Sequence, residues 1–152
     1  MHTILGANGT IGSDLAKELT AYTKQIRLVS RNPKKINDTD EFFAADLSDD
    51  YKLTVWRDKW PRLMRAVLDA CIKHGAKLVF FDNVYLYDKS AIPHMTEESP
   101  VNPPSEKGKV RRQIADMMMN EIKNGKLKGL IARAADFYGP HNAKSMLQET
   151  VY

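Results

Sequence analysis

Apolar runs alternate with amphipathic stretches along this chain, which predicts strands that alternate with helices. The runs predict strands over residues 3–5, 26–29, 42–45, 78–81 and 130–134. Helical spacing of apolar residues predicts a helix through Ile11, Leu15 and Leu19 and two longer helices over residues 55–74 and 109–123. This order is typical of an α/β protein with a parallel sheet, wound right-handed, with helices on both faces.

The predicted boundaries depend on a few residues with strong local preferences. Gly75 stands where a helix C-terminal cap is expected, and Pro61 either begins the helix before it or kinks it. The run Leu78–Phe81 has the compact apolar character of a strand buried on both faces. Residues 88–105 are polar and rich in proline, which predicts a long loop, and long loops in compact domains are usually functional.

The composition limits the classes of protein to which this chain can belong. The chain has 152 residues with 43% hydrophobic and 28% charged, which fits one globular domain. Its net charge of +4 is scattered rather than gathered in a stripe, so we expect no nucleic-acid partner. No apolar run approaches the roughly 20 residues that span a bilayer, so we expect no membrane partner and a cytoplasmic location.

The metal-ligating and thiol residues do not form a recognisable site. The lone cysteine, Cys71, falls in an apolar helical pattern, where it fills the core. The histidines show no ligand spacing, and we expect no metal; they are His2, His74, His94 and His141.

A glycine-rich turn follows the first strand and opens the first helix, which is the place where such turns bind dinucleotide phosphates. Glycines allow a tight turn, a close approach of the backbone to pyrophosphate and close packing of helix on strand, while the helix N-terminus favours anions. The alternative is an ordinary tight turn. The residues expected to bind cofactor here are Gly6, Asn8, Gly9, Thr10, Ile11 and Gly12.

The end of the second strand decides between cofactors. An acidic residue there would bind an unmodified ribose, whereas this chain has Ser30 and Arg31. A guanidinium suits a 2′-phosphate, so we expect NADP, with NAD as the second option. The alternative role of Arg31 is a solvated surface charge.

Five segments together resemble the extended short-chain dehydrogenase/reductase family, which includes NAD-dependent epimerases and dehydratases. They are Gly6-x-x-Gly9-x-x-Gly12, Asp46-Leu47, and residues 79–87, 96–103 and 133–140. The resemblance implies a Rossmann-type doubly wound sheet and places Asp46 and Leu47 against the adenine. It also implies an NAD(P)-dependent epimerase/dehydratase-like oxidoreductase acting on a small sugar- or nucleotide-linked substrate.

The chain departs from this family at the positions that carry its chemistry. Family members have a serine or threonine after the fifth strand, where this chain has Asp82 and Asn83. The positions that match the family's Tyr-x-x-x-Lys hold Lys107 and Arg111. A desolvated lysine beside another cation can act as an acid, or it can attract an anionic group of an acidic substrate. The alternatives are a non-catalytic NADP sensor, similar to the NmrA-like branch, and a scaffold that keeps only the fold.

Two further departures concern length. The family has a fourth strand where this chain passes directly from Asp50 to Tyr51, so we expect that residues are missing there. Relatives also continue past the point that matches Tyr152 with a smaller substrate domain. The expected partners are a small-molecule substrate and, as one option, a second copy of the chain in a homodimer.

Overall fold

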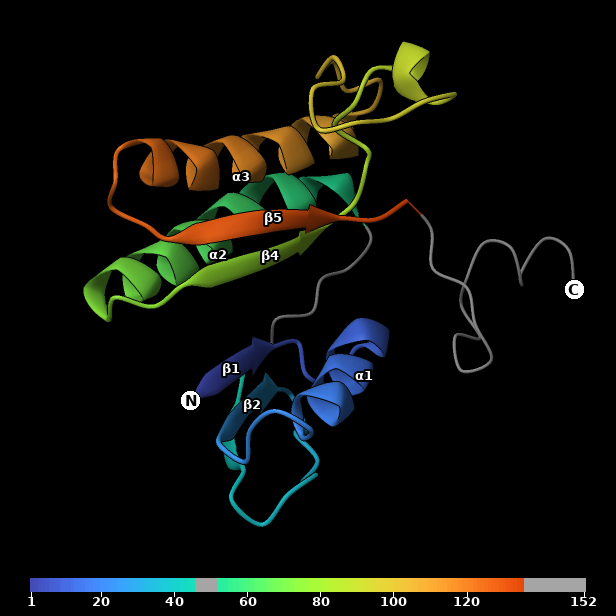
Figure 1. The fold of residues 1–152 in the computed structure, drawn as a ribbon. Coiled ribbons are helices and arrows are strands. Elements are labelled where there is room, and N and C mark those ends of the chain that lie inside the picture. The colour runs from blue at the N-terminus through green and yellow to red at the C-terminus, as the bar shows by residue number, and fades with distance from the viewer. Residues whose placement is uncertain (46–51, 136–152) are drawn as a thin grey trace, which may run out of the picture. The chain divides into compact units, whose positions relative to one another are not determined.

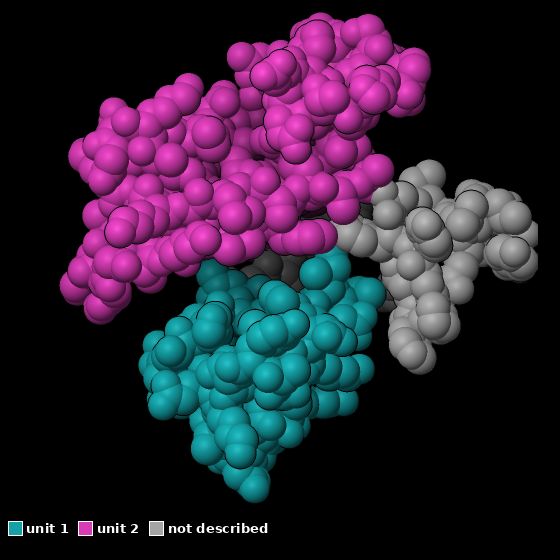
Figure 2. All heavy atoms as spheres, in the orientation of Figure 1, with its two compact units in different colours: residues 1–48 teal, residues 49–152 magenta. Residues whose placement is uncertain are grey.

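The computed structural model describes residues 1–45 and 52–135. The chain divides into two compact units, Met1–Ser48 (unit 1) and Asp49–Tyr152 (unit 2), which Figure 2 shows in different colours. Each unit has its own core, so each is described by itself.

Unit 1 is a three-stranded parallel sheet with one helix (Figure 1). Its elements are β1 (His2–Leu5), α1 (Thr10–Leu19), β2 (Ile26–Ser30) and β3 (Glu41–Ala44), and the strand order is β1-β2-β3. In β2 the alternate residues Ile26, Leu28 and Ser30 are buried, as expected where one face of a sheet is covered. Ile26 and Leu28 pack with Ile4 of β1 and Ala16 of α1 to form the core.

The opposite face of this sheet carries a row of apolar side chains. The strand register sets Leu5 beside Val29 and Val29 beside Phe43, so all three lie on one face. Leu5 and Phe43 are exposed. Beside this row, Arg27 bonds Glu41 at 2.7 Å and lies 5.0 Å from the centre of the Phe43 ring.

Unit 2 is a two-stranded parallel sheet with two long helices that run side by side (Figure 1). Its elements are α2 (Leu53–Lys73), β4 (Leu78–Asp82), the short 3₁₀ helix η1 (Lys89–Ala91), α3 (Glu106–Lys123) and β5 (Gly129–Arg133). The strand register runs from Leu78 beside Gly129 to Asp82 beside Arg133. The buried core residues come from both helices and the turn before β5: Met64, Leu68, Ile114, Met118 and Leu127.

The predicted order of strands and helices is confirmed, and the strand pairs within the described residues are all parallel. Gly75 has a φ of +60° and ends α2 as a C-terminal cap, as predicted. Pro61 lies inside α2, which continues on both sides of it. Cys71 packs against the core of unit 2, and burial raises the pKa of its thiol.

Two local predictions were wrong. The predicted start of α3 near Lys109 is three residues late, because the Ser105 side chain caps the helix by accepting a hydrogen bond from the Gly108 N–H at 3.0 Å. The strand Leu78–Phe81 is not buried on both faces: Val79 is 57% exposed and Phe81 is 42% exposed. In unit 2 the two helices pack against the face that carries Leu78 and Phe80, and a short apolar run cannot reveal which of its faces is covered.

The strands also pair in two sheets where one sheet was predicted. Among the described strands, β1 pairs with β2 alone and β4 pairs with β5 alone. A strand missing between Asp50 and Tyr51 would produce this pairing, and that explanation stays a prediction. No helix within residues 1–45 and 52–135 is long and apolar enough to cross a membrane.

Candidate functional site

The glycine loop of unit 1 is fastened to the end of β2. The N–H groups of Gly6 and Ala7 donate to the carbonyl oxygen of Val29 at 2.9 and 3.2 Å, and the Gly9 N–H donates to the Gly6 carbonyl oxygen at 2.9 Å. Gly6 has a φ of +79°, a conformation that residues with a Cβ rarely adopt. The loop therefore holds one tight conformation at the carboxyl ends of β1 and β2.

Close packing of helix on loop depends on Gly12. A Cβ at this position would lie 2.2 Å from the Gly6 carbonyl oxygen, a distance that real Cβ atoms essentially never show, and 3.0 Å from the Ala7 Cα. The α1 N-cap is Gly9, and no side chain caps the helix, so the first-turn N–H groups of Thr10 and Ile11 stay available for an anion. These features fit the phosphates of a dinucleotide.

The end of β2 adds cationic and polar groups beside the loop. Ser30 is 6% exposed, and its Oγ has no hydrogen-bond partner among the described residues. Arg31 follows it, with Lys34 and Lys35 exposed a few residues on. The Asn8 side-chain amide donates to the backbone carbonyl oxygen of Asn32.

Unit 1 thus brings together the glycine loop and the end of β2, as the sequence predicts. The residues concerned are Gly6, Asn8, Gly9, Thr10, Ile11, Gly12, Ser30 and Arg31. Asp46 and Leu47, predicted to contact adenine, lie outside the described residues.

A buried ionic cluster occupies the predicted catalytic region of unit 2. The Asp82 side chain is fully buried, with Arg111 Nε 3.2 Å from one carboxylate oxygen and Arg133 Nε 3.6 Å from the other. Burial raises the pKa of Asp82, and the nearby Arg111 and Arg133 charges oppose that rise. The Asp82 carboxylate therefore links Arg133, on β5, to Arg111, on α3.

Aromatic rings surround Arg111. Its guanidinium carbon lies 5.7 Å from the Trp56 ring centre, 5.2 Å from Trp60 and 5.8 Å from Phe80. The Lys107 ammonium lies 4.9 Å from the same Trp56 ring, so Lys107 and Arg111 share one face of α3, as their spacing predicts. We define Asp82, Lys107, Arg111, Arg133, Trp56, Trp60 and Phe80 as the cation cluster.

The remaining predicted residue, Asn83, has a local role. Its Oδ1 accepts a hydrogen bond from the Tyr85 N–H at 3.1 Å, which shapes the turn after β4. Tyr87 is buried, and its hydroxyl accepts from Arg133 Nη1 at 3.2 Å.

Sequence reasoning missed Arg133 and the aromatic residues of the cation cluster. Arg133 reaches Asp82 because the two residues pair in the β4–β5 register, which no short motif encodes. The spacing of Trp56 and Trp60 places them on one helix face, and their rings meet edge to face at 5.8 Å, but the spacing does not reveal that they surround Arg111.

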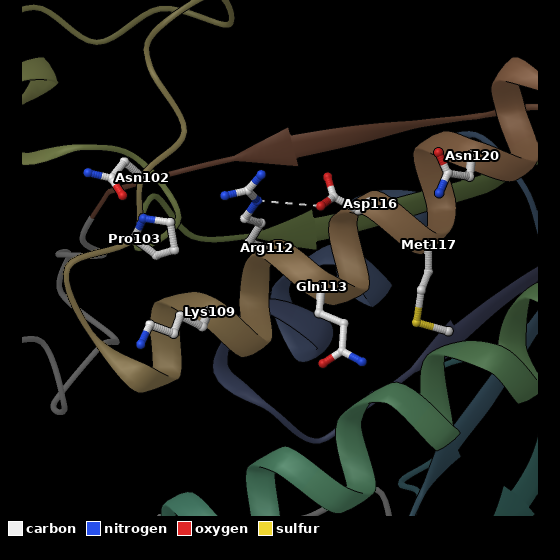
Figure 3. A pocket seen from close by; sticks show the side chains of 8 residues that line it. All are labelled: Asn102, Pro103, Lys109, Arg112, Gln113, Asp116, Met117 and Asn120. Carbon is white, nitrogen blue, oxygen red and sulfur yellow. Dashed lines mark ion pairs between the residues drawn. The ribbon is translucent and has the colours of Figure 1, made fainter.

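A hollow of about 550 Å³ lies along α3 and the segment before it (Figure 3). It is lined by Asn102, Pro103, Lys109, Arg112, Gln113, Asp116, Met117 and Asn120. None of these residues belongs to the cation cluster or to the glycine loop, so the hollow gives no support to either site. Within residues 1–45 and 52–135, no group of three His, Cys, Asp or Glu side chains is placed to hold a metal ion.

Solved structures of sugar-nucleotide epimerases have a fold similar to that of this chain. The chain resembles the crystal structure of a UDP-galactose 4-epimerase with a TM-score of 0.81 at 20% identity, over 99% of this chain and 61% of that one. It resembles the UDP-glucuronic acid 4-epimerase from Bacillus cereus in complex with NAD with a TM-score of 0.78 at 17% identity, over 92% and 58% of the two chains.

A third similar structure is the Bordetella bronchiseptica enzyme WbmG in complex with NAD and UDP. The TM-score is 0.75 at 16% identity, over 97% of this chain and 57% of that one. These structures confirm the predicted Rossmann-type α/β fold. The chain spans about three fifths of their length.

Comparison with protein-family models gave no match. Comparison with curated proteins gave none either. At 16–20% identity the structural likeness concerns the fold, so the chemistry has to be argued from the residues of this chain.

Proposed function

We propose that the chain binds a nicotinamide dinucleotide at the glycine loop of unit 1 and acts as an epimerase/dehydratase-like oxidoreductase on a sugar-nucleotide. The observation that carries the proposal is the loop itself. It is fastened to Val29, it requires glycine at position 12, and it presents the uncapped N-terminus of α1. The bound dinucleotide would supply hydride transfer, while the loop holds its phosphates.

NADP is the cofactor that the end of β2 favours. A protein that binds an unmodified ribose has a carboxylate at the end of this strand. This chain has Ser30 there, followed by Arg31. A carboxylate would repel a 2′-phosphate, whereas a guanidinium can bond it through two N–H groups. The Bacillus cereus and Bordetella structures contain NAD, so the choice of cofactor rests on Ser30 and Arg31 rather than on those structures.

The cation cluster favours an anionic substrate. Its ionisable groups are three cations, Lys107, Arg111 and Arg133, and one carboxylate, Asp82. A positive excess beside aromatic rings suits a phosphate or carboxylate of the substrate, and sugar-nucleotides carry such groups. In this proposal Lys107 attracts the anion, and Asp82 holds the two arginines in place.

A second candidate function follows from the same residues. Arg111 is engaged with Asp82 and three rings, and Lys107 stands where the family's tyrosine would transfer a proton. Such an arrangement also suits a protein that binds dinucleotide without turnover, a sensor similar to the NmrA-like branch. Chemical conversion of a sugar-nucleotide in the presence of cofactor separates the two candidates, because a sensor would leave the sugar-nucleotide unchanged.

Titration with NADPH and NADH, followed by nucleotide fluorescence or calorimetry, tests the cofactor. We expect tighter binding of NADPH, and Arg31→Ala should lower NADPH affinity by about tenfold to a hundredfold, as expected for a lost charge-assisted pair of hydrogen bonds. NADH affinity should hardly change. Equal affinities of the unmutated chain for both nucleotides would contradict the choice of NADP, and no binding of either would contradict the proposed function.

We also infer that a strand-forming segment belongs between Asp50 and Tyr51. The support is that β1 and β4 each pair on one side among the described strands, whereas central strands of a doubly wound sheet pair on both. If this is correct, peptide mapping of the protein isolated from its natural source will find further residues between Asp50 and Tyr51. A peptide in which Asp50 is followed directly by Tyr51 would contradict the inference.

A further inference from the structure

Asn8 connects two loops that the proposed function uses for different purposes. It lies inside the glycine loop, between Gly6 and Gly9, and its side-chain amide donates to the backbone carbonyl oxygen of Asn32, 24 residues further along. The glycine loop is also joined to the Val29 carbonyl oxygen by two backbone hydrogen bonds. The residues between these two attachment points are Ser30 and Arg31.

The rest of the loop between β2 and β3 has its own support. The Asp40 carboxylate accepts hydrogen bonds from the backbone N–H groups of Ile36 and Asn37 at 2.9 and 2.8 Å. This arrangement orders the far end of the loop. The near end, which carries Arg31, is therefore the part whose backbone position the Asn8 hydrogen bond can set.

We propose that Asn8 is a positioning residue for cofactor choice, which acts by holding the turn that carries Arg31 against the glycine loop. The inference rests on the proposed binding of NADP. A 2′-phosphate and a pyrophosphate belong to one rigidly spaced nucleotide, so both are bound well only if the two loops keep a set separation. The hydrogen bond from Asn8 to the Asn32 carbonyl oxygen joins these two loops.

The proposal differs from a direct contact between Asn8 and the nucleotide, and the two can be separated. If Asn8 acts through Arg31, its replacement will weaken NADPH binding only while Arg31 is present. If Asn8 bonds the nucleotide itself, its effect will persist after Arg31 is removed. A double-mutant cycle measures this dependence.

The experiment compares the unmutated chain with Asn8→Ala, Arg31→Ala and the double variant, each titrated with NADPH and NADH. We expect Asn8→Ala to weaken NADPH binding about five- to tenfold, the effect of one lost hydrogen bond, and to change NADH binding less than about twofold. In the Arg31→Ala background, Asn8→Ala should have no further effect on NADPH. Asn120→Ala on α3 makes the same chemical change far along the chain and should leave both affinities unchanged.

Equal weakening of both nucleotides by Asn8→Ala would overturn the proposal, since Asn8 would then serve only the glycine loop. An undiminished effect in the Arg31→Ala background would also overturn it, in favour of direct contact. Far-UV circular dichroism and thermal unfolding of each variant show whether unit 1 is still folded. Failure of the unmutated chain to bind either nucleotide overturns the proposed function as well, whereas normal binding with an inert Asn8→Ala overturns this inference alone.

Discussion

Replacing Arg111 by methionine removes one charge from the buried cation cluster and keeps most of the apolar stem. Asp82 is fully buried and Arg111 Nε lies 3.2 Å from it, while the Arg111 side chain is only 12% exposed. Breaking a buried ion pair by removing one partner destabilises a protein by roughly 3–5 kcal/mol. Arg133 remains 3.6 Å from the other Asp82 oxygen and is 22% exposed, so we expect a loss near the lower end, about 3 kcal/mol.

Urea unfolding followed by tryptophan fluorescence measures this loss in the right part of the chain. Both tryptophans, Trp56 and Trp60, lie on α2 beside Arg111, so their emission reports on unit 2. The matched control is Arg112→Met, the next residue on the same helix. Arg112 Nε lies 3.5 Å from Asp116 with both side chains at least half exposed, so the control should lose less than about 1 kcal/mol.

The pH dependence of the free energy of unfolding gives a second test, and its direction follows from the pKa of Asp82. Burial raises the pKa of Asp82 in the folded chain. The contribution of Asp82 to the free energy of unfolding is therefore complete below the ordinary carboxyl pKa and is lost as the pH rises through the raised pKa. Arg111→Met removes a positive charge that lowers the pKa of Asp82, so the pKa of Asp82 should be higher in the variant than in the parent. The stability difference between variant and parent should therefore grow from acid to neutral pH. Equal losses for Arg111→Met and Arg112→Met, or a difference that does not change with pH, would refute this account of the cluster.

Four further variants, one of them a control, test other features of the structure. Gly12→Ala should abolish dinucleotide binding and destabilise unit 1 by about 1–3 kcal/mol or more, because the new Cβ would lie 2.2 Å from the Gly6 carbonyl oxygen. Calorimetric titration measures the binding and circular dichroism the stability. Retained binding would show that the loop can relax. Arg65→Met should destabilise unit 2 by about 1–2 kcal/mol in urea, because it leaves Glu121, 16% exposed, without the Nη1 donor now at 2.7 Å. Asp69→Ala, which breaks the exposed pair with Arg65, should lose less than about 0.5 kcal/mol, and an equal loss would contradict the role of Glu121. Lys107→Met should weaken binding or turnover of an anionic sugar-nucleotide while dinucleotide affinity stays the same. Unchanged turnover would place the chemistry elsewhere, with Tyr85, Tyr87 and Tyr138 as the next candidates.

The order of the elements and the glycine loop could be predicted from local sequence, because their determinants are local. A run such as Leu78–Phe81 favours a strand wherever it stands, and glycines at positions 6, 9 and 12 favour one loop geometry between a strand and a helix. The spacing of Lys107 and Arg111 likewise placed them on one helix face. Such features depend on residues a few positions apart, so the sequence alone was enough to determine them.

The surroundings of those residues were decided by tertiary structure. Asp82 meets Arg111 and Arg133 through the packing of α3 on β4 and the register of β4 with β5, and Trp56 reaches the same place from α2. The exposed faces of Val79 and Phe81 depend on which face the helices cover, and the sheet pairing depends on which strands are present to pair. The energies of contacts between distant segments depend on how those segments pack, so a linear pattern shows that Asp82 and Arg111 are present but not that they form one buried cluster.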